Sequence, residues 1–202
     1  MSDFIPTGIE LSYLVATALF FLGLKDLGSP ATARKGNLVA AIGMFIAIVA
    51  TLLNQGVLNY EMILLGIVIG SVLGAIAAYK VEMTAMPQMV GLLNGLGGGA
   101  STLVAVAEFW RLLHSPETVS LDSTITMILS IFIGGITLTG SLIAFAKLQE
   151  LMSGSPITFP LQQPINILLL IDFVVGSGYL WVAPNDPTVF LILTWISLVL
   201  GV

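Results

Sequence analysis

The stretch EMILLGIVIGSVLGAIAAY, residues 61–79, decides the fold of this chain. Between Glu61 and Lys80 it carries no charged side chain, and its length lies within the roughly 17–25 mostly apolar residues that a membrane-spanning helix needs. The whole sequence has the same character, since 57% of its 202 residues are hydrophobic and 8% are charged, with a mean hydropathy of +1.06. Soluble domains have about 25% charged residues, so we expect an integral membrane protein.

Further apolar runs lie on both sides of this stretch. The expected spans are residues 9–25, 37–55, 61–79, 87–109, 123–146, 164–183 and 188–202, separated by segments rich in proline and polar residues. The predicted fold class is therefore all-α, a polytopic bundle of about seven transmembrane helices. The last run covers only about two-thirds of a crossing. It is either a half-span or a helix that continues beyond Val202, and we favour the second interpretation.

The basic residues predict the orientation, because cytoplasmic loops are enriched in Lys and Arg. Loops on one side of the predicted membrane hold Lys25, Arg34, Lys35, Lys80 and Lys147. The opposite side receives only Arg111. We therefore expect the N-terminus outside. Its first residues carry an acid and no base, so they do not resemble a cleaved signal peptide.

Two rows of glycines are candidates for helix packing, because small residues at four-residue spacing let membrane helices approach closely. The first row is Gly66, Gly70 and Gly74, and the second is Gly91, Gly95 and Gly99. Residues 95–100 (GLGGGA) also match the dinucleotide fingerprint G-x-G-x-x-G/A. We reject a nucleotide site there, because the fingerprint needs a preceding strand in a soluble βαβ unit and these residues lie inside an apolar span.

Polar side chains at depth raise a functional question, since an ionisable group at the centre of a span costs about 2.5–3.5 kcal/mol on insertion scales. Asn94, Ser141 and Asp172 lie about 9–12 Å from the same predicted boundary at ~1.5 Å per residue. Thr137 lies one turn before Ser141. A shared polar level is what a hydrophilic path requires. The alternatives are that Asn94 bonds a neighbouring helix and that the hydroxyls bond the carbonyl one turn back.

Other chemistry finds little support in the sequence. The absence of cysteine excludes disulfides, thiolate nucleophiles and cysteine-based metal sites. The single histidine, His114, falls in a predicted loop, and no carboxylate pair or Ser/His/Asp grouping suggests hydrolysis. The net charge of -5 is scattered, which argues against nucleic acid. We predict no catalytic residue, metal or bound cofactor in this chain.

Several stretches closely resemble the β subunit of the proton-translocating NAD(P) transhydrogenases. They are residues 23–25 (GLK), 30–34 (PATAR), 83–90 (MTAMPQMV), 93–99 (LNGLGGG), 132–135 (FIGG), 139–149 (TGSLIAFAKLQ) and 156–160 (PITFP). Together they cover most of the chain at compatible order and spacing, and jointly they are highly specific.

The resemblance implies a membrane domain of the bacterial plasma (inner) membrane that conducts protons while hydride passes from NADH to NADP⁺ on soluble domains. NAD(H) and NADP(H) would bind to partner domains, and the implied partners are α-type subunits, an NADP-binding domain and a second copy of the complex. Family members have histidine or asparagine at the position of Asn94, so here a titratable histidine would come from an α-type subunit. Ser141 matches a serine on the same path. Asp172 matches no family motif, and its candidacy rests on depth.

A complete family β subunit continues with two more spans and an NADP-binding domain. We therefore expect residues 1–202 to be part of the proton-conducting membrane domain and to be inactive in hydride transfer alone. Two alternatives stay open from the residues themselves: a secondary transporter or channel with glycine-rich packing, and a membrane subunit used only for assembly. A transporter should show broken helices at corresponding positions in two halves.

Overall fold

The computed structural model describes residues 4–53, 60–115 and 119–202, and every regular element in these ranges is helical. The α-helices are α1 (Phe4–Leu27), α2 (Ala33–Leu53), α3 (Tyr60–Lys80), α4 (Met86–Leu113), α5 (Leu121–Leu148), α6 (Gln162–Val182) and α7 (Pro187–Leu200), with the 3-10 turn η1 (Met83–Ala85) before α4. The all-α prediction is confirmed.

Six of these helices are long and apolar enough to cross a membrane, and α7, with 14 residues, is shorter. The chain is thus an integral membrane protein. Helix α4 extends beyond the predicted span at 87–109, to Leu113, and α5 extends beyond the predicted 123–146 at both ends. Apolar composition marks the hydrocarbon-embedded part, whereas the helices continue through polar residues at the interface. Positions 54–55 of the second predicted span lie outside the described residues.

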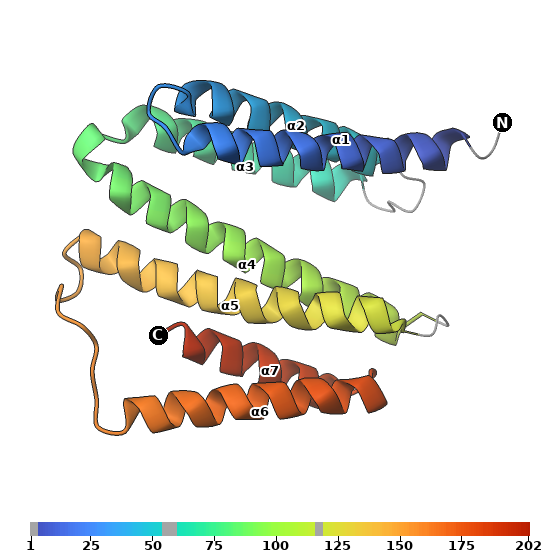
Figure 1. Ribbon diagram of the computed structural model, residues 1–202, viewed down its shortest axis with the longest axis vertical. Helices are drawn as coiled ribbons and strands as arrows, with labels where there is room; N and C mark the ends of the chain where they lie inside the picture. Colours follow the sequence, from blue (N-terminus) through green and yellow to red (C-terminus); the bar gives the residue numbers. More distant parts are fainter. Residues whose placement is uncertain (1–3, 54–59, 116–118) are drawn as a thin grey trace. The chain divides into compact units, whose positions relative to one another are not determined.

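The helices fall into two compact units, residues 1–79 and 80–202. In the first unit, α1 and α2 form an antiparallel pair (Figure 1). Its close contact is built from glycines: a methyl group at Gly36 would lie 2.7 Å from the Gly23 carbonyl oxygen, and one at Gly43 would lie 3.1 Å from the Ala16 carbonyl oxygen. The small residues thus bring the two backbones together, as expected where lipid provides no hydrophobic drive for association.

Helix α3 differs from its neighbours in the chain because it has no buried residue. A methyl group at Gly66, Gly70 or Gly74 would meet no atom within 4 Å among the described residues. Within the first unit, the first predicted glycine row on α3 is therefore not covered by another helix.

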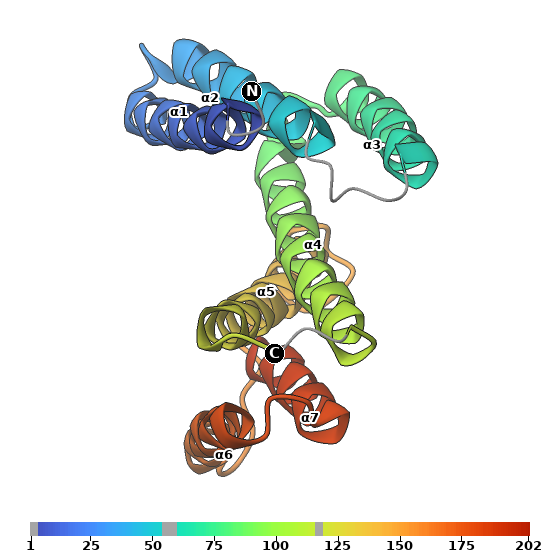
Figure 2. The same ribbon diagram turned by 90° about the vertical axis from the view of Figure 1, so that its right-hand side faces the viewer.

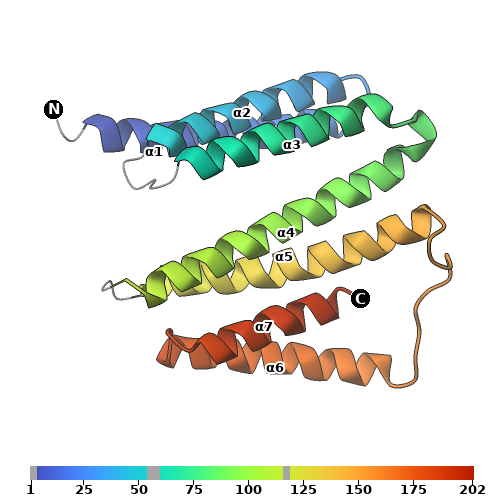
Figure 3. The same cartoon turned by 180° about the vertical axis from the view of Figure 1, so that it is seen from behind.

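The second unit is organised around α4 and α5, which run antiparallel along most of their lengths (Figure 3). Their backbones come closest at Gly98 and Gly134, where a methyl group on Gly98 would lie 2.7 Å from the Gly134 carbonyl oxygen. Where α4 begins and α5 ends, Gln88 Nε2 donates to the Leu148 carbonyl oxygen over 3.1 Å. These contacts fix the register of the two helices.

Helix α7 contacts both α5 and α6 (Figure 2). The buried core of the unit lies here, with the rings of Phe109 and Phe190 stacked at 4.0 Å and those of Phe132 and Phe173 at 4.5 Å. Asp186 caps the N-terminus of α7, because its carboxylate accepts hydrogen bonds from the backbone N–H groups of Thr188 (2.9 Å) and Val189 (3.2 Å). The core of this unit thus leaves one side of the α4–α5 pair available for a polar site.

Candidate functional site: a polar groove on the α4–α5 pair

Asn94 on α4 and Ser141 on α5 form a hydrogen bond between the two helices. Asn94 Nδ2 donates to Ser141 Oγ over 2.9 Å. The glycine next to Asn94 makes this possible, since a methyl group at Gly95 would lie 3.2 Å from Ser141 Cβ. The structure therefore brings together two of the residues that the sequence predicts to lie at one depth. Asn94 and Ser141 are 47 residues apart in the chain, and their hydrogen bond links α4 to α5.

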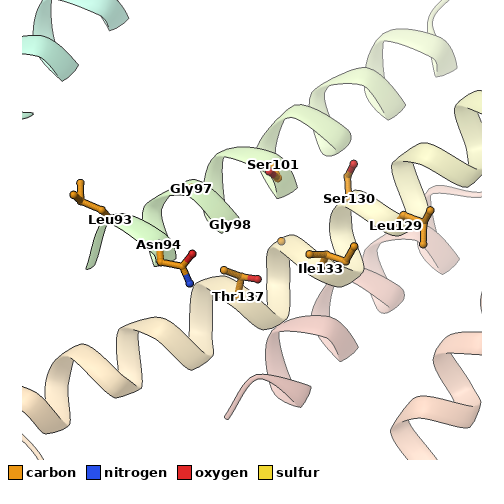
Figure 4. A pocket seen from close by; sticks show the side chains of 10 residues that line it. Leu93, Asn94, Gly97, Gly98, Ser101, Leu129, Ser130, Ile133 and Thr137 are labelled. Carbon is orange, nitrogen blue, oxygen red and sulfur yellow. The ribbon is translucent and has the colours of Figure 1, made fainter. Parts of the chain in front are cut away.

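The amide of Asn94 lines one end of a groove of about 490 Å³ between α4 and α5 (Figure 4). The groove is lined by Leu93, Asn94, Gly97, Gly98, Ser101, Leu129, Ser130, Ile133, Gly134 and Thr137. Four of these side chains are polar, and they come from both helices. A polar surface of this kind is unusual in a bilayer, where polar side chains normally face a partner, a cavity or water.

Thr137 is a second predicted residue of this groove. Its Cβ would lie 2.8 Å from a methyl group at Gly98, so the threonine stands directly against the closest contact of α4 and α5. Because Gly98 has no side chain, α4 leaves space for the Thr137 side chain of α5 at the edge of the groove.

Asp172 lies apart from this group. It is at the middle of α6, ten residues from Gln162 and ten from Val182, and its side chain is exposed. Helix α6 packs into the core through Phe173 and Leu180, and Asp172 is not part of that buried contact. Among the described residues its carboxylate has no hydrogen-bond partner, and the structure does not bring it to Asn94, Ser141 or Thr137.

The second predicted glycine row lies on the α5-facing side of α4, but it is not the closest contact. A methyl group would lie 3.7 Å from its nearest atom at Gly91 and 3.2 Å at Gly95 and at Gly99. The tightest position, Gly98, is outside the predicted row. A four-residue period identifies a helix face, whereas the crossing point within that face depends on the partner helix.

Residues 95–100, which match the dinucleotide fingerprint, are part of helix α4. His114 follows the last turn of the same helix, and its Nδ1 lies 2.8 Å from the Trp110 carbonyl oxygen. Arg111 makes a two-pronged ion pair with Glu108, with both N···O distances at 2.8 Å. No group of three or more potential metal-ligating side chains occurs among the residues that the structure describes.

Ser101 and Ser130 also line the groove, although neither was among the predicted pathway residues. The signal was present in their spacing. Ser101 lies seven residues after Asn94, and Ser130 lies seven residues before Thr137. Seven residues are close to two helical turns, so each serine lies on the same helix face as its counterpart.

Comparisons with known proteins match this chain to one family. Residues 9–202 match the family described as NAD(P) transhydrogenase beta subunit. Two curated relatives named NAD(P) transhydrogenase subunit beta, from Rhodospirillum rubrum and from a strain of that species, are each 43% identical over 159 residues. These matches cover 75% of this chain and 33% of each relative, so the aligned region spans about a third of the relatives' length.

Proposed function

Since this chain belongs to the family of NAD(P) transhydrogenase β subunits, we propose that it forms the proton-conducting membrane part of a transhydrogenase complex. Protons cross the bilayer along the α4–α5 groove while hydride passes from NADH to NADP⁺ on soluble partner domains. NAD(H) and NADP(H) bind to those domains, and this chain contributes no reacting group to the hydride step.

The observation that carries the proposal is the hydrogen bond between Asn94 and Ser141 at the end of a polar groove. With Nδ2 donating to Ser141, the amide oxygen of Asn94 keeps its lone pairs and the Ser141 hydroxyl keeps its hydrogen for a further partner. The pair can therefore accept on one side and donate on the other. Such a pair supports proton passage along hydrogen bonds through an apolar layer that otherwise excludes charge.

Neither side chain titrates in the physiological range, so the pair orients a proton carrier without holding the proton. In the proposed complex a titratable side chain, a histidine on a membrane helix of an α-type subunit, faces Asn94. Thr137 belongs to the same path because it lines the groove beside the Gly98 contact.

Asp172 is a further proposed pathway residue, on the exposed side of α6. A carboxyl at the middle of a span is costly when it faces lipid. We therefore place its side chain against water or a partner helix in the assembled complex. The partners of that complex are α-type subunits and an NADP-binding domain.

The complex is a homodimer in a bacterial plasma membrane, with the N-terminus of this chain outside. The bias of the basic residues supports this orientation, with Lys147 at the cytoplasmic end of α5 and Arg111 at the outer end of α4. The uncovered glycine row of α3 supports a packing role for Gly66, Gly70 and Gly74 against a helix outside the first unit.

The test is purification of the native complex through a tag on this chain, followed by reconstitution into vesicles. We expect nucleotide-binding subunits to co-purify, and proton movement to accompany hydride transfer between NAD(H) and NADP(H). This first experiment uses the unaltered chain, and it measures only whether proton movement is coupled to hydride transfer. Recovery of the chain without nucleotide-binding partners, or hydride transfer that moves no protons, would contradict the proposal.

A further inference from the structure

Three hydroxyls in the groove differ in their hydrogen bonding from other Ser and Thr hydroxyls of helices α4, α5, α6 and α7. Ser101, Ser130 and Thr137 line the groove, and none of them donates a side-chain hydrogen bond to another described residue. The hydroxyls that donate to a carbonyl oxygen three or four residues back are those of Thr102, Thr124, Thr126, Thr139, Ser177, Thr194 and Ser197. Back-bonding is the usual state of a hydroxyl in a membrane helix. The three groove hydroxyls thus keep their hydrogen for a partner inside the groove.

These hydroxyls follow one another along the helix pair. Asn94 and Ser141 mark a common level because they are hydrogen-bonded, and the helices are antiparallel. Counted from that level at ~1.5 Å per residue, Thr137 lies about 6 Å along the pair, Ser101 about 10 Å and Ser130 about 16 Å. Figure 4 shows the same order, Asn94, Thr137, Ser101 and Ser130.

The resulting axial intervals are about 4–6 Å, and the lateral offset between the two helices adds to them, so one or two waters are needed between successive hydroxyls. Two hydrogen bonds of about 2.8 Å through one water join oxygens up to about 5.6 Å apart. The groove volume of about 490 Å³ is large enough, since a water molecule occupies about 30 Å³ in the liquid. Water also needs several polar partners, and four polar side chains line this groove.

We propose that the groove holds a file of water molecules bridging Asn94, Thr137, Ser101 and Ser130, and that Ser101 and Ser130 position its far half. The file leads from the Asn94–Ser141 pair toward the Arg111 end of α4. A lipid chain or an apolar helix in the same place would leave the three hydroxyls without a partner, which is unfavourable. The presence of water is inferred from the groove alone, whereas a role of that water in proton transfer rests on the proposed function.

Cysteine accessibility tests the water file directly. The chain contains no cysteine, so a single introduced thiol reports one position in it. Ser101→Cys and Ser130→Cys are made in the native complex, in vesicles, and exposed to a small charged methanethiosulfonate. The matched control is Leu103→Cys, two residues from Ser101, exposed and outside the groove.

We expect both groove cysteines to react at least roughly tenfold faster than Leu103→Cys, because the reacting thiolate forms in water and not in hydrocarbon. Equal, slow modification at all three positions would overturn the water file. Modification is read on this chain by mass shift, which separates it from cysteines of partner subunits.

Alanine substitution tests the positioning role. Ser101→Ala and Ser130→Ala each remove a hydroxyl, and we expect hydride-coupled proton uptake to fall roughly two- to twelvefold per site, the rate equivalent of one net hydrogen bond. Ser101→Thr and Ser130→Thr should restore the rate, because the hydroxyl returns. Ser177→Ala is the control, since the Ser177 hydroxyl is bonded to the Phe173 carbonyl oxygen, outside the groove.

The outcomes separate the two proposals. Fast modification of the groove cysteines together with normal pumping by an Asn94 variant would contradict the proposed proton path and leave the water file standing. Loss of pumping in an Asn94 variant, with slow modification and unaffected serine-to-alanine variants, would overturn the further inference and leave the proposed function standing.

Discussion

Gly98→Ala should weaken the α4–α5 pair more than any comparable change on α4. The added methyl group would lie 2.7 Å from the Gly134 carbonyl oxygen and 2.9 Å from the Leu138 backbone nitrogen. Both are backbone atoms, so no rotamer change can relieve the clash, and the helices must move apart. Ordinary van der Waals contact begins near 3.4 Å, so the required displacement is about 0.5–1 Å, which forfeits a quarter to a half of the contact energy along the interface.

Gly97→Ala is the matched control for stability. It makes the same chemical change one residue earlier on α4, where a methyl group would meet nothing within 4 Å among the described residues. Both substitutions gain roughly 1 kcal/mol of helix propensity, so their difference isolates the overpacking. We expect Gly98→Ala to be less stable than Gly97→Ala by about 1–3 kcal/mol.

The assay is the free energy of unfolding of the second unit in bicelles, measured by steric trapping with labels on α4 and α5. The same separation should lengthen the 2.9 Å bond between Asn94 and Ser141, so the Gly98 variant should also lose coupled proton transfer. Equal stabilities for the two variants would refute the assignment of Gly98 as the closest helix contact.

Three further predictions follow from other elements. Asp186→Ala should destabilise α7 by about 0.5–2 kcal/mol because two backbone N–H groups lose their cap, and Asp186→Asn should retain most of the stability in the same unfolding measurement. Gly70→Leu should reduce recovery of the assembled complex on size-exclusion chromatography, whereas Ile69→Leu should not; equal recovery would count against packing at the α3 glycine face. Asp172→Asn should lower hydride-coupled proton uptake in vesicles, and an unchanged rate would remove Asp172 from the pathway.

The sequence was sufficient for the number and order of the long helices, because apolar length and proline-rich breaks reflect the bilayer directly. It also placed Asn94 and Ser141 at one level, since both depths were counted from boundaries on the same side. The helix ends were less predictable. Polar residues such as Arg111 and Lys147 extend α4 and α5 beyond their apolar parts, through interfacial turns that hydropathy does not mark.

The contact partners of the glycines could not be read from the chain. The sequence shows that Gly91, Gly95 and Gly99 share a face, but the position of closest approach, Gly98 against Gly134, depends on how two helices cross. The close α1–α2 contact at Gly23, which the spacing argument did not select, has the same explanation. Ser101 and Ser130 were not predicted as pathway residues because single hydroxyls in a span usually bond their own backbone.

Asn94 is the residue on which the proposed proton path depends most. The direct measurement is hydride-coupled proton uptake by vesicles that contain the native complex with Asn94→Leu, beside Leu103→Ala as a variant outside the groove. The leucine removes the bond to Ser141 and fills the polar end of the groove. We expect coupled uptake to fall at least roughly tenfold, the equivalent of about 1.4 kcal/mol, while Leu103→Ala pumps normally. Pumping by Asn94→Leu at the unaltered rate would contradict the placement of Asn94 in the proton path.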